Sequence, residues 1–212
     1  MRKTPSIKKL YENSKKNVAT HLTDSTALMI ASTPAFAAFE TFVAKMPHDQ
    51  SLHARYLAVG ATFAGMGRLF TGGMDLSRKL FHISQETPEK NKQVHDALYA
   101  ITYNAIMGPL FYLGAGARDF KQIAIGTACG MGLALFMGGP MGYAVDSYRD
   151  FIGINNSTRL PVSIQNKSRS SKLALASILA AASVGLTAGV YELSSYLNRN
   201  NNQSQISLGV TK

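Results

Sequence analysis

A small side chain stands at every fourth position of one apolar stretch in the middle of the chain. The positions are Gly126, Gly130, Ala134, Gly138 and Gly142. In a soluble helix each glycine would cost about 1 kcal/mol relative to alanine. In a bilayer, small residues let helix backbones approach closely, which is how membrane helices associate. The stretch therefore predicts a tightly packed transmembrane helix, with a glycine-rich buried helix of a soluble protein as the alternative.

Apolar residues are gathered into windows of about 20 residues, the length that crosses a bilayer. Five windows lie at 25–44, 56–76, 97–117, 122–145 and 173–193. Bulk composition hides them, since the mean hydropathy is only −0.01. We expect an all-α, polytopic membrane bundle of four core helices, followed by a fifth apolar helix. For the fifth helix, an amphipathic surface helix is the alternative.

These windows divide the chain into five parts. They are a basic N-terminal segment (1–23), a four-helix core (24–152), a basic linker (153–172), the fifth apolar helix (173–197) and a polar tail (198–212). The tail has no apolar pattern, and its composition predicts disorder.

The basic residues predict an orientation. If the spans alternate, most of the 22 Lys and Arg residues fall on one side, in segments 1–23, 77–95 and 147–172. The positive-inside rule makes this side the cytoplasm. We therefore expect a multi-pass protein of the cytoplasmic (inner) membrane, with a cytoplasmic N-terminus. Anionic lipid accounts for the net charge of +10, so no nucleic acid is expected as a partner.

The charges of the core follow a pattern that occurs twice. Asp24 and Asp96 open the first and third windows, and the second and fourth windows end in Asp-x-x-Arg at Asp75 and Asp146. The spacing within each half is nearly the same. We expect two helical hairpins related by duplication, as in transporters with parallel repeats. Chance similarity is the alternative.

All four aspartates are candidates for proton coupling, because desolvation raises the pKa of a carboxyl group. Asp24 and Asp96 are expected at helix N-termini, where capping is an alternative role. Asp75 and Asp146 are expected at helix C-termini, where the helix dipole opposes a negative charge. The arginine one turn after each of these two is its expected ion-pair partner.

Three further polar residues lie within the windows. Arg68 is a candidate for binding a substrate carboxylate, with a salt bridge to a neighbouring helix as the alternative. Glu40 is either solvated or linked to protons, with Arg55 and Lys45 as expected partners. Asn104 is a candidate substrate contact or a hydrogen-bonding link between helices.

The sequence offers little for other chemistry. The five histidines lack ligand spacing, the single cysteine is Cys129, and neither a Ser-His-Asp group nor a phosphate-binding loop is present. We therefore expect no metal, no cofactor and no enzymatic activity.

Several short motifs in the core occur in a characteristic order. They are Asp24, Glu40, Asp49-Gln-Ser, Arg55, Gly73-Met74, Arg78-Lys79-Leu80-Phe81, Asp96, Ala-Ile-Thr-Tyr-Asn at 100–104, and Met137–Asp146. Over about residues 20–152 this order resembles the AlaE-type L-alanine exporter family. The resemblance implies a four-helix inner-membrane exporter of L-alanine and close analogues, driven by the proton motive force. It also implies self-association through Gly138 and Gly142.

We therefore expect a proton-coupled exporter whose partners are L-alanine or a similar small neutral amino acid, protons, membrane lipid and further copies of the chain. Asp146 is the first choice for the proton carrier, and Arg68 for the substrate carboxylate. The alternative is a non-transporting membrane protein that assembles through glycine ribbons, which are helix faces with a small residue at every fourth position, as at Gly126 to Gly142.

Overall fold

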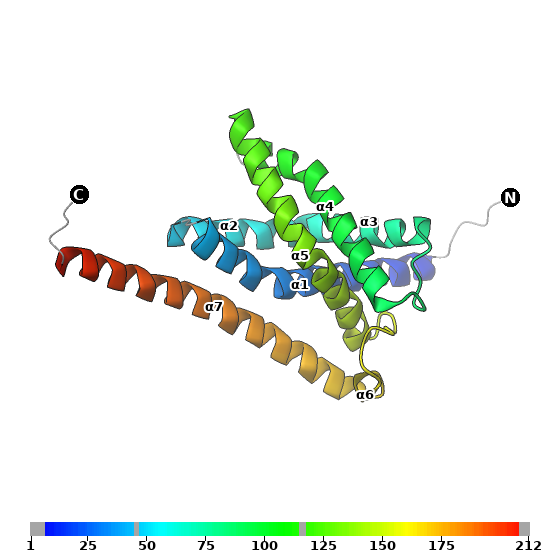
Figure 1. Cartoon of the computed structure of the whole chain (residues 1–212). Helices are drawn as coiled ribbons and strands as arrows, with labels where there is room; N and C mark the ends of the chain where they lie inside the picture. The colour runs from blue at the N-terminus through cyan, green and yellow to red at the C-terminus, as the bar shows by residue number, and fades with distance from the viewer. Residues whose placement is uncertain (1–6, 45–46, 115–117, 208–212) are drawn as a thin grey trace.

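The computed structural model describes residues 7–44, 47–114 and 118–207, and these residues form helices and connecting loops without a strand (Figure 1). The long helices are α1 (Ile7–Ala38), α4 (Glu89–Gly114), α5 (Phe120–Ile152) and α7 (Arg169–Ser207). Shorter elements are the π-helical η1 (Phe39–Val43), α2 (His48–Ala61), the π-helical η2 (Thr62–Met66), α3 (Gly67–Leu80) and α6 (Val162–Gln165).

Three helices of the described part of the chain are long and apolar enough to cross a membrane. They cover Tyr11–Val43, Ile123–Ile152 and Arg169–Leu197. Large apolar side chains on them are exposed, including Phe136 and Val184 at more than 70%. An apolar surface of this kind fits lipid tails rather than water. The chain therefore has the features of an all-α membrane protein.

The window at 56–76 is not the single continuous helix that its apolar composition predicts. The π turn η2 separates α2 from α3, and Gly65 within it has a φ of +132°. This conformation is open to glycine and strained for other residues. The next predicted span, 97–117, is helical in α4 as far as Gly114, and residues 115–117 lie outside the described residues.

The helices form two crossing layers with α7 along one side. In Figure 1 the α4–α5 pair crosses α1, and α2 and α3 run beside α1. α7 packs on α1, where Ser183 Oγ donates to Ile30 O at 2.9 Å, and on α5, where Tyr148 Oη donates to Ala176 O at 2.7 Å. The core lies where these helices meet and includes Ala27, Leu28, Phe70, Met74, Ala100, Ala134, Val145, Tyr148 and Phe151.

The small residues of α5 lie against α4 of the same chain. A Cβ on Gly138 would lie 2.5 Å from Ala97 Cα, and a Cβ on Gly142 would overlap the Asp96 carboxylate. Farther along, Ala134 is buried and Gly130 faces Asn104, while Gly126 is half-buried. The close approach is thus made within one chain. Because α4 already fills this face, Gly138 and Gly142 are not open to a second copy.

The first and last long helices include parts of the basic N-terminal segment and of the polar tail. α1 begins at Ile7, so the described part of the basic N-terminal segment is helical. α7 continues past Asn198 to Ser207, into the segment for which the composition predicts disorder. The physical reason is that adding a residue to an existing helix is much easier than starting one. Residues 208–212 lie outside the described residues.

Candidate functional site

The guanidinium of Arg149, near the end of α5, joins carboxylates from two other helices. Its Nε and Nη2 each donate to Asp24 of α1 at 2.7 Å, and its Nη1 donates to Asp75 of α3 at 2.9 Å. Asp24 is fully buried, accepts from Thr71 Oγ1 at 2.7 Å and lies 3.4 Å from Arg68 Nη1. A two-pronged contact of this kind is the strong geometry for an arginine and a carboxylate.

Arg78, near the end of α3, makes the corresponding contacts, but with two aspartates that come later in the chain. Its Nε and Nη2 donate to Asp96 of α4 at 2.9 and 2.6 Å, and its Nη1 donates to Asp146 of α5 at 3.0 Å. Asp96 is fully buried, and its Oδ1 lies 3.2 Å from His95 Nδ1. Each arginine thus holds one aspartate in a fork and a second through a single bond.

A third arginine comes from the loop after α5. The Arg159 side chain is 1% exposed, and its Nη1 donates to Asp96 at 2.9 Å and to Asp146 at 3.0 Å. Its Nη2 donates to Glu89 at 2.6 Å. Burial works against its charge, but these hydrogen bonds outweigh burial and raise the pKa of Arg159.

The observed ion pairs connect different helices, whereas the sequence predicts pairs within one helix. Arg78 binds Asp146 rather than Asp75, and Arg149 binds Asp75 rather than Asp146. A pair one turn apart on a helix contributes only about 0.2–0.5 kcal/mol. Leaving a buried carboxylate of a facing helix without a cation would cost more free energy than such a pair contributes. The arginines therefore bind the carboxylates of the facing helices. The set Asp24–Arg149–Asp75 and Asp96–Arg78–Asp146 is called the crossed ion pairs below.

Asp24 and Asp96 are not helix caps, which corrects the capping alternative. α1 begins at Ile7 and α4 at Glu89, so both aspartates lie inside their helices. The apolar windows begin at these residues, but the preceding polar turns continue the same helices. Both carboxylates are instead neutralised by arginine.

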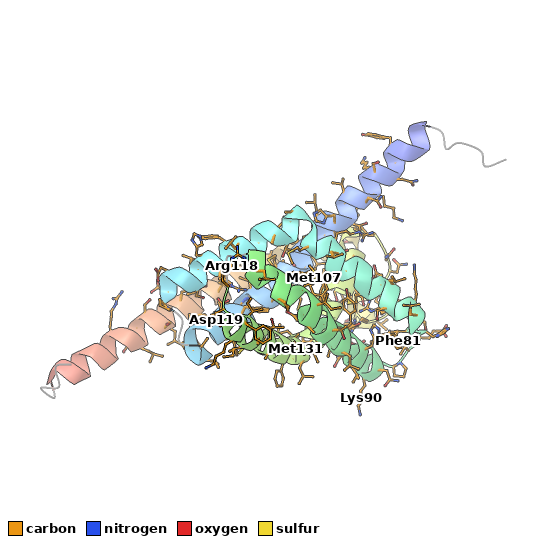
Figure 2. All side chains as sticks on the ribbon, turned by 90° about the horizontal axis from the view of Figure 1, so that it is seen from above. Phe81, Lys90, Met107, Arg118, Asp119 and Met131 are labelled. Carbon is orange, nitrogen blue, oxygen red and sulfur yellow. The ribbon has the colours of Figure 1, made fainter. Side chains whose placement is uncertain are left out.

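A cavity of about 380 Å³ opens beside the crossed ion pairs. Its lining comes from the ends of α3 and α5, from the loops that follow them and from Lys92 of α4. Figure 2 labels Lys90, two residues before Lys92 on α4, and Phe81, directly after α3. The charged lining residues are Asp75, Arg78, Lys79, Lys92, Asp146 and Arg149. The uncharged ones are Ile83, Ser84, Gln85, Asn155, Asn156 and Ser157.

Lys92 is the buried cation of this cavity without a carboxylate partner within the described residues. It is 6% exposed, and its Nζ donates to Gln85 O at 2.7 Å and to Thr158 Oγ1 at 3.5 Å. Burial is the largest effect on the pKa of Lys92 and lowers it, while attraction to Glu89 opposes the shift. Sequence reasoning missed Lys92 and Arg159, because both stand in polar segments whose charges predict solvation.

The two predicted substrate contacts lie outside this cavity. Arg68 has a 43% exposed side chain and contacts Asp24, as in the salt-bridge alternative. Asn104 Nδ2 donates to Ala100 O in its own helix at 2.8 Å. Neither residue lines the cavity.

Glu40 lies in η1, directly after α1, in a separate buried cluster. It pairs with Arg55, one of its two expected partners, and accepts from Ser51 Oγ at 2.7 Å. Ser51 Oγ also lies 3.0 Å from Tyr191 Oη of α7. Lys45, the other expected partner, lies outside the described residues.

Within the described ranges, no group of three or more His, Cys, Asp or Glu side chains is placed to hold a metal ion. Arginines occupy the places around the clustered aspartates. No family model, curated protein or solved structure matches the chain. The geometry itself therefore defines the class: a helical membrane protein with a charged cavity beside buried ion pairs.

Proposed function

We propose that the chain is an exporter of L-alanine or a similar small neutral amino acid, driven by the proton motive force across the cytoplasmic membrane. The observation that supports this most is the cavity lined by Asp75, Arg78, Asp146 and Arg149. Charged groups on membrane helices are costly and mark pathways for ions and substrates. The cavity adjoins the segments that the basic residues assign to the cytoplasm, where an exporter takes up its substrate.

The proposal includes a core of two duplicated hairpins, α1 with α2 and α3, and α4 with α5. It is supported by the exchange of arginines, because each half neutralises the aspartates of the other. It is also supported by two close approaches. A Cβ on Gly67 would lie 2.6 Å from Ser25 Oγ, and one on Gly138 would lie 2.5 Å from Ala97 Cα. Ser25 and Ala97 each follow the buried aspartate directly.

In this mechanism Asp146 carries the proton. Its side chain is 11% exposed, lines the cavity and accepts from Arg78 and Arg159. After the amino acid has left on the outer side, Asp146 takes up a proton from that side, which removes one of the negative charges that bind Arg78 and Arg159. The contact between the two halves changes, and the cavity returns to the cytoplasmic side. Loss of the proton to the cytoplasm restores the ion pairs, so one proton moves inward as one amino acid moves outward.

Replacing Asp146 with asparagine tests this role. Asp146→Asn keeps the size of the side chain and some hydrogen bonding but cannot ionise, so alanine efflux should no longer respond to a pH gradient. The measurement is efflux from loaded vesicles with and without an imposed gradient. Asp119→Asn is the matched control, because Asp119 is an exposed cap of α5 and asparagine also caps helices. Gradient-driven export by Asp146→Asn at the wild-type rate would contradict the role.

A second candidate function, assembly without transport, is favoured by one observation on α7. A Cβ added at Gly185 or Gly189 would meet no neighbouring atom of the described chain within 4 Å, so this face of α7 is open. A partner helix could approach it closely. Vesicles in which the wild-type protein is inserted but exports none of the common amino acids would favour this function over export.

A further inference from the structure

We propose that the cavity holds its amino acid as a zwitterion between Lys92 and Asp75. The ligand carboxylate binds the Lys92 ammonium, and the ligand ammonium binds Asp75. This inference rests on the proposed function, and it assigns the substrate contacts to residues other than Arg68 and Asn104.

Lys92 provides a positive charge that no carboxylate of the described residues contacts directly. Its two hydrogen bonds go to uncharged oxygens, Gln85 O and Thr158 Oγ1. An ammonium group has three donors, so one remains for a ligand. Buried charges are normally paired, and no carboxylate of the described chain lies within salt-bridge distance of Lys92 Nζ. A carboxylate in the cavity would complete this site.

Asp75 provides the negative charge for the ligand ammonium, and it lines the same cavity as Lys92. Its Oδ1 accepts from Arg149 Nη1 at 2.9 Å, while no hydrogen bond within the described residues uses Oδ2. The side chain is 35% exposed. Asp146 differs, because its Oδ1 is taken by Arg78 and its Oδ2 by Arg159. Among the two cavity aspartates, Asp75 is therefore the one with an oxygen available for an ammonium group.

The rest of the lining suits a small ligand. A volume of about 380 Å³ lies at the lower end of the range for small-molecule sites. The uncharged residues of the lining are mostly Ser, Asn and Gln, and Ile83 is the apolar one. Such a surface offers hydrogen bonds to the polar ends of a zwitterion and little contact for a long apolar side chain. The ligand class is thus a small neutral α-amino acid.

Calorimetric titration of the full chain in lipid nanodiscs tests the site with four probes. L-Alanine carries both charges, propionate lacks the ammonium, ethylamine lacks the carboxylate, and glycerophosphoethanolamine represents a lipid headgroup. We expect L-alanine to bind and each of the other probes to bind about tenfold more weakly or worse.

Variants of Lys92 supply the second part of the test. Lys92→Gln should weaken L-alanine binding about tenfold or more, and Lys92→Arg, which keeps the charge, should restore part of it. Lys90→Gln, an exposed neighbour on α4, should bind like the wild type. Asp75→Asn should also weaken binding, with thermal melting as the check that the fold survives.

Several results would overturn the site. They are wild-type affinity in a folded Lys92→Gln variant, propionate binding as tight as L-alanine binding, or preference for the headgroup probe. If Lys92→Gln does not fold, Lys92→Arg and the single-charge probes decide the question.

Export assays separate this site from the proposed function. Export with an unchanged KM in Lys92→Gln would reject the site and leave the function standing. Lys92-dependent binding by a protein that exports nothing would reject the function and leave the site standing.

Discussion

At the scale of single residues, the arginines explain why so many charges are tolerated inside the bundle. Arg149 and Arg78 each bind one aspartate through two nitrogens and a second aspartate through the third. The planar guanidinium has donors for all of these contacts, whereas lysine is a point charge without the fork. Removing one partner leaves a buried charge uncompensated, which costs about 3–5 kcal/mol.

A double-mutant cycle can show which aspartate pairs with which arginine. For Asp75→Asn with Arg149→Gln we expect a coupling energy of about 0.5–3 kcal/mol in thermal or denaturant unfolding, because the side chains are in direct contact. For Asp146→Asn with Arg149→Gln we expect a smaller coupling, although the two residues are one turn apart. The opposite order of the two couplings would contradict the crossed arrangement.

The identities of these residues could be predicted from the sequence, but their partners could not. The repeated Asp-x-x-Arg pattern points to Asp75, Asp146 and their arginines. Spacing along one helix says nothing about which residue of a distant helix will face them, so the predicted pairs are wrong. Arg159 and Lys92 carry no pattern in the sequence, because their burial depends on how the loops fold back over α4.

At the scale of helices, the glycines of α5 fix how close α4 can come. Gly138→Leu should destabilise the protein, since its first side-chain atom would overlap the backbone of α4 at Ala97 and Asp96. A cost of about 1–3 kcal/mol or more is expected for such overpacking. Thermal melting in detergent measures it. Gly185→Leu on α7 is the control, because a Cβ at that position meets no neighbouring atom of the described chain within 4 Å.

An equal melting temperature for both glycine variants would show that close packing at Gly138 is not needed.

The apolar windows predict that α1, α5 and α7 exist, and the structure confirms three helices of spanning length. Their ends were less predictable, because polar turns extend α1 and α7 beyond the apolar residues. The π turn at Gly65 depends on a backbone conformation that apolar composition does not encode.

At the scale of the whole molecule, the basic segments predict a definite orientation. In a Cys129→Ser background, a membrane-impermeant maleimide added to intact cells should label Asp49→Cys. Glu86→Cys, in the loop beside the cavity, should be labelled only after the membrane is permeabilised, because the positive-inside rule places that loop in the cytoplasm. Both positions are exposed in the structure. Labelling of Glu86→Cys from outside would reverse the orientation and place the cavity on the outer side.

The crossed ion pairs also set an order of events during synthesis. The main partner of Asp24 is Arg149, which lies 125 residues later in the chain. When the first helices leave the ribosome, Arg149 has not yet been made, whereas Arg68, whose Nη1 lies 3.4 Å from Asp24 Oδ2 in the finished fold, is already present. Asp96 comes after Arg78 in the chain, so this partner is already present when Asp96 is made. Its other arginine, Arg159, is made 63 residues later. The first half of the protein therefore stays incompletely neutralised until translation of α5 is almost finished.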